Sequence, residues 1–343
     1  MTSLLALLFL AGTVHAAPAA RPAYPGAMSD KAFGVLLLAE GGGRDLLDSI
    51  TTMTTTYAAQ FPLEYAGGEA DVKAIQKAVD RLQGRRIKKL VVVPLYASSH
   101  SPLMEQTRYI FGIREEPPAE FFTAARRPAG YSIQRRVQFQ GKLSVVLAAA
   151  PDDDPLVVDV LTSRALALSK HPDAEALVLV GLVPDATPPD EAVLGRGPKP
   201  PTAADGFRQT LSFLAERVRA RGGFKSAHPA VLSPEARHQS EREGREEELR
   251  SLVRSLSRSR RVLVVPCAVT GGETAQHIVR ALRGTFMRYN EKGLLPDPRM
   301  VRWVGQAVNQ ALPLPDMRVY KDAGKPLPGA VKPLGVKLSG SLK

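Results

Sequence analysis

Two residues that can do chemistry together stand where strands of this chain are expected to end. Glu40 follows the apolar run FGVLLLA (33–39), and His100 follows the run KKLVVVPLY (88–96) after two serines. A carboxylate and an imidazole can hold a divalent metal ion or accept a proton near neutral pH. In open parallel sheets, ligands bind beyond the carboxyl ends of the strands. If the two strands are neighbours, Glu40 and His100 face one crevice, and we predict a metal-binding or proton-transfer site there.

Small and polar residues flank this pair. Three glycines follow Glu40 and remove side-chain bulk, so a large flat ligand could approach the backbone there. These glycines lack the spacing of a dinucleotide or Walker fingerprint. Both key residues also have simpler interpretations, since a histidine at a helix start can be a cap and Glu40 can complement a helix dipole. At these strand ends, the residues expected beside a ligand are Gly41, Gly42, Tyr96, Ser98 and Ser99.

The elements that must position these residues alternate short apolar runs with helix-period stretches. Buried strands that alternate with helices indicate a parallel sheet covered on both faces. In the first part of the chain we expect strands at 33–39, 62–66 and 88–96 and helices at 44–60, 69–83 and 102–112. The segment GYSIQRRVQF (130–139) is expected to end this first unit.

The same alternation starts again in the second part of the chain. We expect helices at 154–170, 203–221 and 235–257, strands at 175–184 and 224–232, and a strand followed by a helix within 260–282. Aligning LVVVPLYASSH with VLVVPCAVTGG matches the two VVP runs and places His100 opposite Gly272. This diverged duplication predicts an α/β protein of two tandem flavodoxin-like units, each a mostly parallel sheet with helices on both faces, with a cleft between the halves.

Both ends of the chain differ in composition from these units. An apolar run is followed by Val14-His15-Ala16, which resembles a cleavage site, so we interpret residues 1–16 as an export signal, with a buried N-terminal helix as the alternative. We therefore expect an exported (periplasmic or extracellular) protein without a transmembrane segment in the mature chain, or a cytoplasmic protein if the signal is not functional. The remaining expected segments are a flexible leader (17–32), the first unit (33–147), the second unit (148–315) and a basic disordered tail (316–343).

The composition narrows the classes of partner. Hydrophobic residues make up 44% of the 343 residues and charged residues 23%, which is typical of a globular protein. The net charge of +12 predicts attraction to an anionic partner, but no RNA-binding signature accompanies it, so we expect no specific nucleic-acid ligand. Cys267 is the only cysteine, which excludes an internal disulfide and a four-cysteine metal site.

Four stretches of the sequence together resemble a known family. GVLLLAEGGG, VVVPLYASSHS, DDDPLVVDVLTSRALALSKHPDAEALVLVG and YNEKGLLPDPRMVRWV are similar to the sirohydrochlorin cobaltochelatase (CbiX-like) group, whose fold is ferrochelatase-like. The resemblance extends over residues 33–310 and is strongest to the two-domain members of the group. It implies two tandem chelatase-like domains, with pseudo-symmetric halves of parallel sheet around a cleft.

The same resemblance implies an activity. It points to a lyase that inserts Co²⁺ or Fe²⁺, with Ni²⁺ as a further candidate, into an anionic tetrapyrrole of the sirohydrochlorin type, as in cobalamin or sirohaem biosynthesis, without an organic cofactor. On this interpretation Glu40 and His100 are metal ligands and proton acceptors, while arginines such as Arg44 and Arg108 pair with carboxylates of the macrocycle. The family usually has a histidine where this chain has Glu40, and another in the second half where this chain has Leu182. We therefore expect a one-histidine site that holds metal more weakly than a two-histidine site.

Two other classes of function stay open at this point. An exported, non-catalytic metal- or tetrapyrrole-binding protein derived from a chelatase would agree with the leader and with the missing histidines. An interaction protein would instead use the charged helix at 235–260 or the basic tail. An open cleft that contains Glu40 and His100 would favour the first two classes, and a packed interior would favour neither of them.

Overall fold

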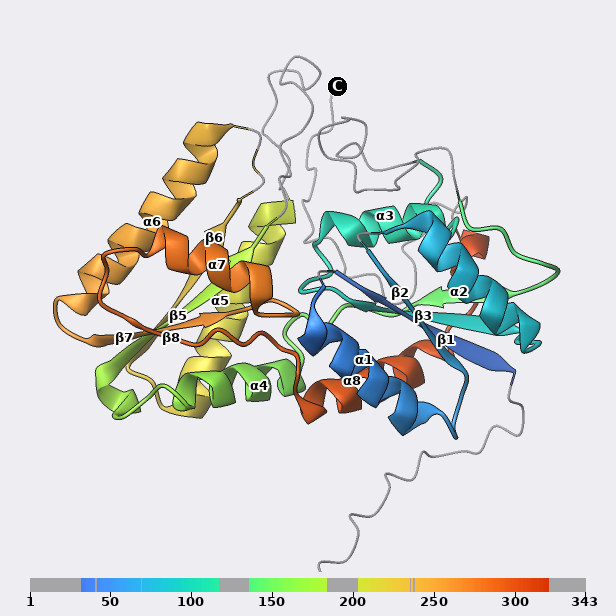
Figure 1. Ribbon diagram of the computed structural model, residues 1–343, viewed down its shortest axis with the longest axis horizontal. Coiled ribbons are helices and arrows are strands. Elements are labelled where there is room, and N and C mark those ends of the chain that lie inside the picture. Colours follow the sequence, from blue (N-terminus) through green and yellow to red (C-terminus); the bar gives the residue numbers. More distant parts are fainter. Residues whose placement is uncertain are drawn as a thin grey trace, which may run out of the picture. The chain divides into compact units, whose positions relative to one another are not determined.

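The strands of the chain form two sheets with the same internal order. The computed structural model describes residues 32–40, 42–68, 70–116, 136–183, 203–234, 236 and 238–320. The first sheet has the order β2-β1-β3-β4 and the second the order β6-β5-β7-β8. Figure 1 shows the strands of both sheets with the helices packed around them. Every strand pair in both sheets is parallel. This arrangement confirms the predicted α/β class with two tandem units, and the equal strand order supports their origin by duplication.

The first half alternates strands and helices without interruption. Its elements are β1 (Phe33–Ala39), α1 (Arg44–Tyr57), β2 (Leu63–Gly67), α2 (Val72–Gly84), β3 (Lys89–Leu95), α3 (Pro102–Ile110) and β4 (Ser144–Leu147). The first unit does not end at 130–139 as expected, because a further strand, β4, follows this segment, of which 130–135 lie outside the described residues. The short apolar run of β4 closes the sheet instead, and it pairs with β3.

The second half repeats this order. Its elements are α4 (Pro155–Leu166), η3 (Pro172–Ala174), β5 (Glu175–Leu182), α5 (Ala203–Gly222), β6 (Ser226–Leu232), α6 (Gln239–Ser257), β7 (Arg261–Pro266), α7 (Gly272–Ala281), β8 (Arg288–Tyr289), α8 (Pro298–Ala311) and η4 (Met317–Tyr320). Four of the described helix starts have the side-chain caps that the sequence favours, because Asp71, Ser101, Asp154 and Asp297 each accept a backbone N–H two residues ahead.

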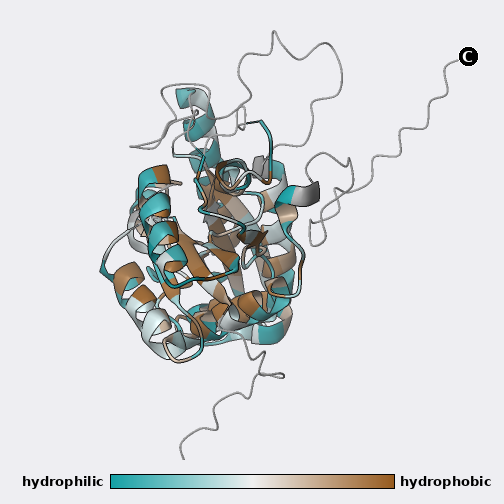
Figure 2. Ribbon diagram, turned by 90° about the vertical axis from the view of Figure 1, so that its right-hand side faces the viewer, coloured by the Kyte–Doolittle hydropathy of each residue, from teal (hydrophilic) through white to brown (hydrophobic). Residues whose placement is uncertain are grey.

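The central strands are apolar on both faces because helices cover both faces of each sheet. From Val35 to Leu38 and from Leu90 to Val93, no residue of β1 or β3 is more than 2% exposed. Figure 2 shows the hydrophobic strands on the inside and hydrophilic helix surfaces on the outside. A strand with this continuous apolar run fits only the middle of a parallel sheet with two covered faces.

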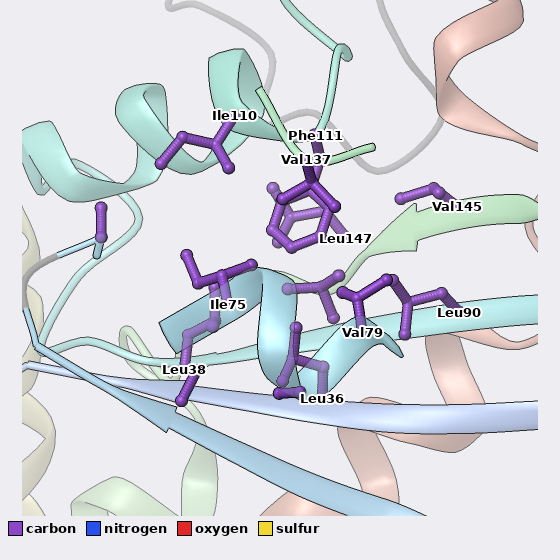
Figure 3. Packing of buried hydrophobic residues seen from close by; sticks show 14 of the residues in the cluster. Leu36, Leu38, Ile75, Val79, Leu90, Ile110, Phe111, Val137, Val145 and Leu147 are labelled. Carbon is purple, nitrogen blue, oxygen red and sulfur yellow. The ribbon is translucent and has the colours of Figure 1, made fainter. Parts of the chain in front are cut away.

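One core of the first half lies between its sheet and helices α2 and α3. Leu36 and Leu38 of β1 pack against Ile75 and Val79 of α2, and Ile110 of α3 closes the same cluster (Figure 3). Helices α1 and α8 cover the opposite face of this sheet (Figure 1). The sheet is therefore held rigidly from both sides, and so are the carboxyl ends of β1 and β3.

The two halves exchange their last helices. Helix α4, which follows the strands of the first half, packs against β7 and α5 of the second half. Helix α8, which follows the strands of the second half, packs against β3 and α1 of the first half. The hydroxyl of Tyr57 donates to the carbonyl of Val301 at 2.7 Å, and Lys89 Nζ donates to the carbonyls of Leu312 and Leu314, each at 2.8 Å. The described residues from Ala32 onward thus belong to one compact unit.

The structure describes only small parts of the end segments that the sequence predicts. The expected signal (1–16) and almost all of the leader lie outside the described residues. Residues 316–320, which the sequence assigns to the tail, belong to the folded unit, because Met317 is buried in the core of the first half. The rest of the tail lies outside the described residues. Among those described, no helix is both long and apolar enough to cross a bilayer.

Candidate functional site

The candidate site lies where β1 and β3 end side by side. The two strands are direct neighbours in the sheet, and the last residue of β1, Ala39, pairs with the last residue of β3, Leu95. Glu40 therefore leaves the sheet beside the loop that carries His100. Both residues line one cavity, as the sequence predicts from their positions at strand ends. The far wall of this cavity comes from the second half of the chain, with Leu182, Val183 and Phe207.

Hydrogen bonds from two directions fix the loop between β3 and α3. On one side, the N–H of Ala97 donates to Oε1 of Glu40 at 3.0 Å. On the other side, Oδ1 of Asp152 accepts from the N–H of Ser99 at 2.7 Å and from the hydroxyl of Ser98 at 3.2 Å. The N–H of His100 in turn donates to Oγ of Ser98 at 3.1 Å. The backbone of His100 is thus positioned through Ser98 by a carboxylate from the linker between the halves.

The start of α3 lies beside the cavity, directly after His100. Ser101 caps the helix by accepting the N–H of Leu103 at 3.3 Å, and Pro102 occupies the first helical position. Serine at the cap and proline at the next position are the residues that a helix start favours. His100 is therefore the last residue of the loop before the cap, and it is half-buried.

The ring of His100 lies directly against the first turns of α5. A Cβ atom placed on Gly206 would lie only 2.5 Å from Nδ1 of His100 and 2.7 Å from its Cγ. A second glycine makes room in the same way, because a Cβ on Gly181 would lie 2.4 Å from a ring carbon of Phe207. Two positions without side chains in the second half therefore accommodate the two rings that line the cavity.

The cavity itself is narrow and has one polar side. Its volume is about 20 Å³, which is room for a single water molecule. Glu40, Ser98, His100 and Ser101 supply its polar side. In the described part of the chain, no group of three or more His, Cys, Asp or Glu side chains lies close enough together to hold a metal ion. The donor set at this position is therefore one carboxylate and one imidazole, with serine hydroxyls beside them.

The duplication brings the corresponding strand ends of the two halves together. The prolines of the two VVP runs, Pro94 and Pro266, pair with the residues two positions before Glu40 and Leu182. Glu40 and Leu182 are thus equivalent in the two halves, and both line the same cavity. The alignment likewise gives His100 a glycine as its counterpart. The polar side chains that line this cavity therefore come from the first half of the chain, and the second half contributes apolar side chains.

The thiol of Cys267 does not add a ligand. Cys267 is 1% exposed, and burial, together with the nearby charge of Asp152, raises its pKa to about 12. Cys267 does not line the cavity, so the donors available there are nitrogen and oxygen atoms.

Several residues that the sequence assigns to ligand binding have other roles. Tyr96 is 1% exposed in the first core, and burial raises the pKa of its hydroxyl. The hydroxyl of Thr107 donates to a backbone carbonyl, so Tyr96 is the donor in the 3.0 Å bond between the two hydroxyls. Because it is enclosed, Tyr96 cannot contact a ligand in this structure. Arg108 is paired with Glu105 of its own helix.

The other predicted ligand contacts lie on the surface or support the loop. Gly42 and Arg44 are exposed at the start of α1, and Gly41 lies outside the described residues. Ser98 lines the cavity, whereas Ser99 binds the linker, since its hydroxyl accepts the N–H of Ala150 at 3.1 Å. These two serines are therefore parts of the framework that holds His100.

Three residues of the site were not identified from the sequence. Asp152 lies in the acidic linker between the halves, in which Asp154 caps α4. Asp152 has a φ of 41°, a left-handed conformation that aspartate tolerates better than most residues. Gly206 and Phe207 belong to an amphipathic helix far along the chain, and nothing in the sequence shows that they meet His100.

Comparisons with known proteins agree with this architecture. No protein-family model matches the chain, and no curated protein matches it. Among solved structures, SirB from Bacillus subtilis with Fe³⁺ has a TM-score of 0.52 at 12% identity, covering 85% of this chain and 98% of that chain. The sirohydrochlorin chelatase SirB from Bacillus subtilis subspecies spizizenii in complex with cobalt has a TM-score of 0.49 at 12% identity, covering 85% and 97%. DR2241 from Deinococcus radiodurans, a multi-domain protein with structural similarity to chelatases, has a TM-score of 0.46 at 14% identity, covering 80% and 55%. The chain therefore has the two-unit α/β fold of the SirB-like chelatases.

Proposed function

We propose that this protein acts in tetrapyrrole metal chemistry, as a chelatase that inserts Co²⁺ or Fe²⁺ into a sirohydrochlorin-type macrocycle. The observation that carries the proposal is the position of Glu40 and His100, which leave adjacent strand ends and line one cavity between the halves. The SirB-like fold supports it, since one such structure is described as a sirohydrochlorin chelatase in complex with cobalt. The fold alone does not determine an activity.

The two residues have the chemistry that metal insertion needs. A carboxylate and an imidazole are suitable ligands for Co²⁺, Fe²⁺ or Ni²⁺, and a site with few protein ligands can release the ion to a macrocycle. Two pyrrole N–H protons must also leave the ring, and a neutral imidazole can accept a proton near pH 7. We assign His100 and Glu40 as the two metal ligands, and each accepts one of the two pyrrole protons as the ion passes to the macrocycle.

Instead of the open cleft expected around Glu40 and His100, the structure has a narrow cavity there, so the proposal requires a site that opens. The cavity of about 20 Å³ is much smaller than the pockets of several hundred Å³ that hold small organic ligands. Entry of a macrocycle would therefore require the loop that carries His100 to separate from Gly206 and Phe207 of α5. Metal ions can reach a smaller opening, so metal binding and macrocycle binding can be measured separately.

A direct assay tests the activity. The full chain is incubated with sirohydrochlorin and Co²⁺ or Fe²⁺, and metal insertion is followed through the absorbance of the macrocycle across the neutral pH range. We expect insertion by the wild type, loss of at least about 100-fold in rate for His100→Ala, and no loss for His228→Ala. His228 is the matched control because it is also half-buried but lies on β6, bonded to Ser226. Absence of insertion at every pH would exclude the catalytic proposal.

A second candidate function is that of a non-catalytic binder of metal or tetrapyrrole. The observation that favours it is the occupied state of Glu40, whose Oε1 already accepts the N–H of Ala97, while the equivalent Leu182 offers no ligand. Titration calorimetry with Co²⁺, Ni²⁺ and haem-type ligands would then show binding without insertion. If the protein bound none of them, this candidate would also be excluded.

Export is proposed together with this second candidate. The motivation is the apolar run followed by Val14-His15-Ala16 at the start of the chain. Mass spectrometry of the mature N-terminus after expression tests it, and cleavage after Ala16 is the expected result. Recovery of the uncut chain from the cytoplasm would contradict the proposal.

A further inference from the structure

A second feature lies at the opposite end of the second sheet, where its strands begin. From Leu249 to Gly272 the sequence has no Asp or Glu, and the same holds from Thr274 to Asn290. These two segments contain eight arginines. They are Arg250, Arg254, Arg258, Arg260, Arg261, Arg280, Arg283 and Arg288. The interval from Leu249 to Asn290 thus holds eight arginines and one acid, Glu273, whereas the whole chain has 34 acidic residues among 343.

The fold brings these two segments together. Helices α6 and α7 lie side by side on one face of the sheet, joined by a 3.0 Å hydrogen bond from Arg250 Nε to the carbonyl of Ala281 (Figure 1). Both helices end at the edge where β7 and β8 begin. Because β7 and β8 are parallel neighbours, the loops that precede them, 258–260 and 282–287, are adjacent.

Four of the arginines keep their charge available for a partner. Within the described residues, no ion pair engages Arg258, Arg280, Arg283 or Arg288, and all four are exposed. The neighbouring arginines are different, since Arg250 is paired with Glu247 and Arg261 with the buried Glu175. We call these four arginines, together with Phe286, the basic edge.

Phe286 is presented to solvent by an ordered loop. Phe286 is 88% exposed, whereas Leu282 on the same loop is 1% exposed. Met287 packs against the hydrophobic core of the second half. Thr285 holds the turn through two bonds to the carbonyl of Leu282, one from its N–H at 3.1 Å and one from its hydroxyl at 2.8 Å. One turn before Arg283, Val279 is also 50% exposed. The loop therefore buries Leu282, packs Met287 partly inward and leaves the ring of Phe286 outside.

We propose that the basic edge docks the protein on an anionic phospholipid surface. Exposed arginines attract anionic headgroups, and an aromatic ring with an aliphatic neighbour can enter the boundary between headgroups and acyl chains. Surfaces that bind single-stranded nucleic acid combine basic residues with several stacking aromatic rings. In the described part of this edge, Phe286 is the only fully exposed ring, and Val279 beside the arginines favours lipid.

Vesicle co-sedimentation tests the proposal with the full chain. Vesicles of phosphatidylcholine alone are compared with vesicles that contain phosphatidylglycerol, at low and high salt. We expect binding only to the anionic vesicles. Each arginine near such a surface strengthens binding about fivefold, so the triple variant Arg280→Gln, Arg283→Gln, Arg288→Gln should bind about 100-fold more weakly at low salt. Phe286→Ser should bind about tenfold more weakly, with a loss that persists at high salt.

Matched controls separate this surface from general charge and from the ends of the chain. Lys73→Gln, Lys77→Gln, Lys142→Gln removes the same charge from exposed positions of the first half, and Phe213→Ser removes another exposed ring. Neither should change vesicle binding by more than about twofold. All variants keep both termini, so a difference between them comes from the substituted surface.

Three outcomes would overturn the proposal. Equal losses in the basic-edge variants and in their controls would mean that net charge alone drives binding. Failure to bind anionic vesicles, with Phe286-dependent binding of single-stranded DNA instead, would assign the surface to nucleic acid. Failure to bind vesicles, with self-association that Phe286→Ser removes, would assign it to a second copy of the chain.

Discussion

The substitution Gly206→Ala examines the assembly of the candidate site most directly. Gly206 lies in α5, and the Cβ atom of alanine would lie 2.5, 2.7 and 2.9 Å from three atoms of the His100 ring. Carbon atoms in normal contact are about 3.5–4.0 Å apart, so the ring has to move by about 1 Å. The change adds a single methyl group in the second half of the chain and leaves every residue of the first half unaltered.

Two opposing effects set the expected change in stability. Replacing a helical glycine by alanine normally stabilises a protein by about 1 kcal/mol. Overpacking of a well-filled site costs about 1–3 kcal/mol. The free energy of unfolding should therefore fall by no more than about 2 kcal/mol, and the variant should fold. Because residues that orient a ligand affect metal affinity by about 10- to 100-fold, Co²⁺ binding should weaken by that factor.

Two measurements check this prediction, and they are independent of each other. NMR of the imidazole resonances reports the movement of His100 whether or not the protein binds metal, and calorimetry reports Co²⁺ affinity. Gly244→Ala is the matched control, because a Cβ on this exposed glycine of α6 meets nothing within 4 Å. It should stabilise the protein by about 1 kcal/mol and leave His100 unchanged. Unaltered His100 resonances in Gly206→Ala would refute the geometry described here, and a shift without any wild-type Co²⁺ binding would refute only the metal assignment.

Three further substitutions test the supports of the fold and the site. Thr107→Val removes the acceptor of the buried Tyr96 hydroxyl, so urea denaturation should show a loss of about 1–3 kcal/mol, and Thr107→Ser should retain most of the stability. Asp152→Ala removes two bonds to the loop before α3 and should cost about 1.5–3 kcal/mol, with faster amide exchange in that loop. Asp153→Ala, at an exposed neighbouring position, should change stability by less than about 0.5 kcal/mol, and equal losses for the two variants would contradict this role. For Glu175, burial opposes ionisation, but hydrogen bonds from a serine and two backbone amides, with a nearby arginine, hold its pKa below the usual 4.5. Its stabilising contribution is therefore complete above pH 4.5 and is lost as the pH falls through the lower folded-state value, so Glu175→Gln should flatten this acid dependence of unfolding.

The sequence allowed most of the architecture to be predicted. Runs such as FGVLLLA and KKLVVVPLY are apolar at every position, which suits only strands covered on both faces, and both became central strands. The duplicated VVP runs likewise occupy equivalent strands in the two sheets. Short strands were harder to predict, because the four residues of β4 have too few positions to show a period.

The sheet against which a given helix packs could not be predicted from the sequence. The sequence puts residues up to 315 in the second unit, but α8 packs against the sheet of the first half. An amphipathic helix shows that it has an apolar face, and its pattern does not identify the sheet which that face covers. The exchange of α4 and α8 between the halves is therefore a property of the tertiary structure alone.

In the candidate site, too, some features could be predicted from the sequence and others depend on the tertiary structure. From the sequence alone, Glu40 and His100 could be placed at strand ends of a parallel sheet. The end of a strand shows in the residues next to it along the chain, because the apolar run stops there. Their shared cavity, the anchoring of the loop by Asp152 and the packing of the His100 ring on Gly206 depend on contacts between segments more than 50 residues apart. Such contacts arise only when two complete halves pack together, since sequence patterns encode which face of an element is buried and not which distant residue meets it.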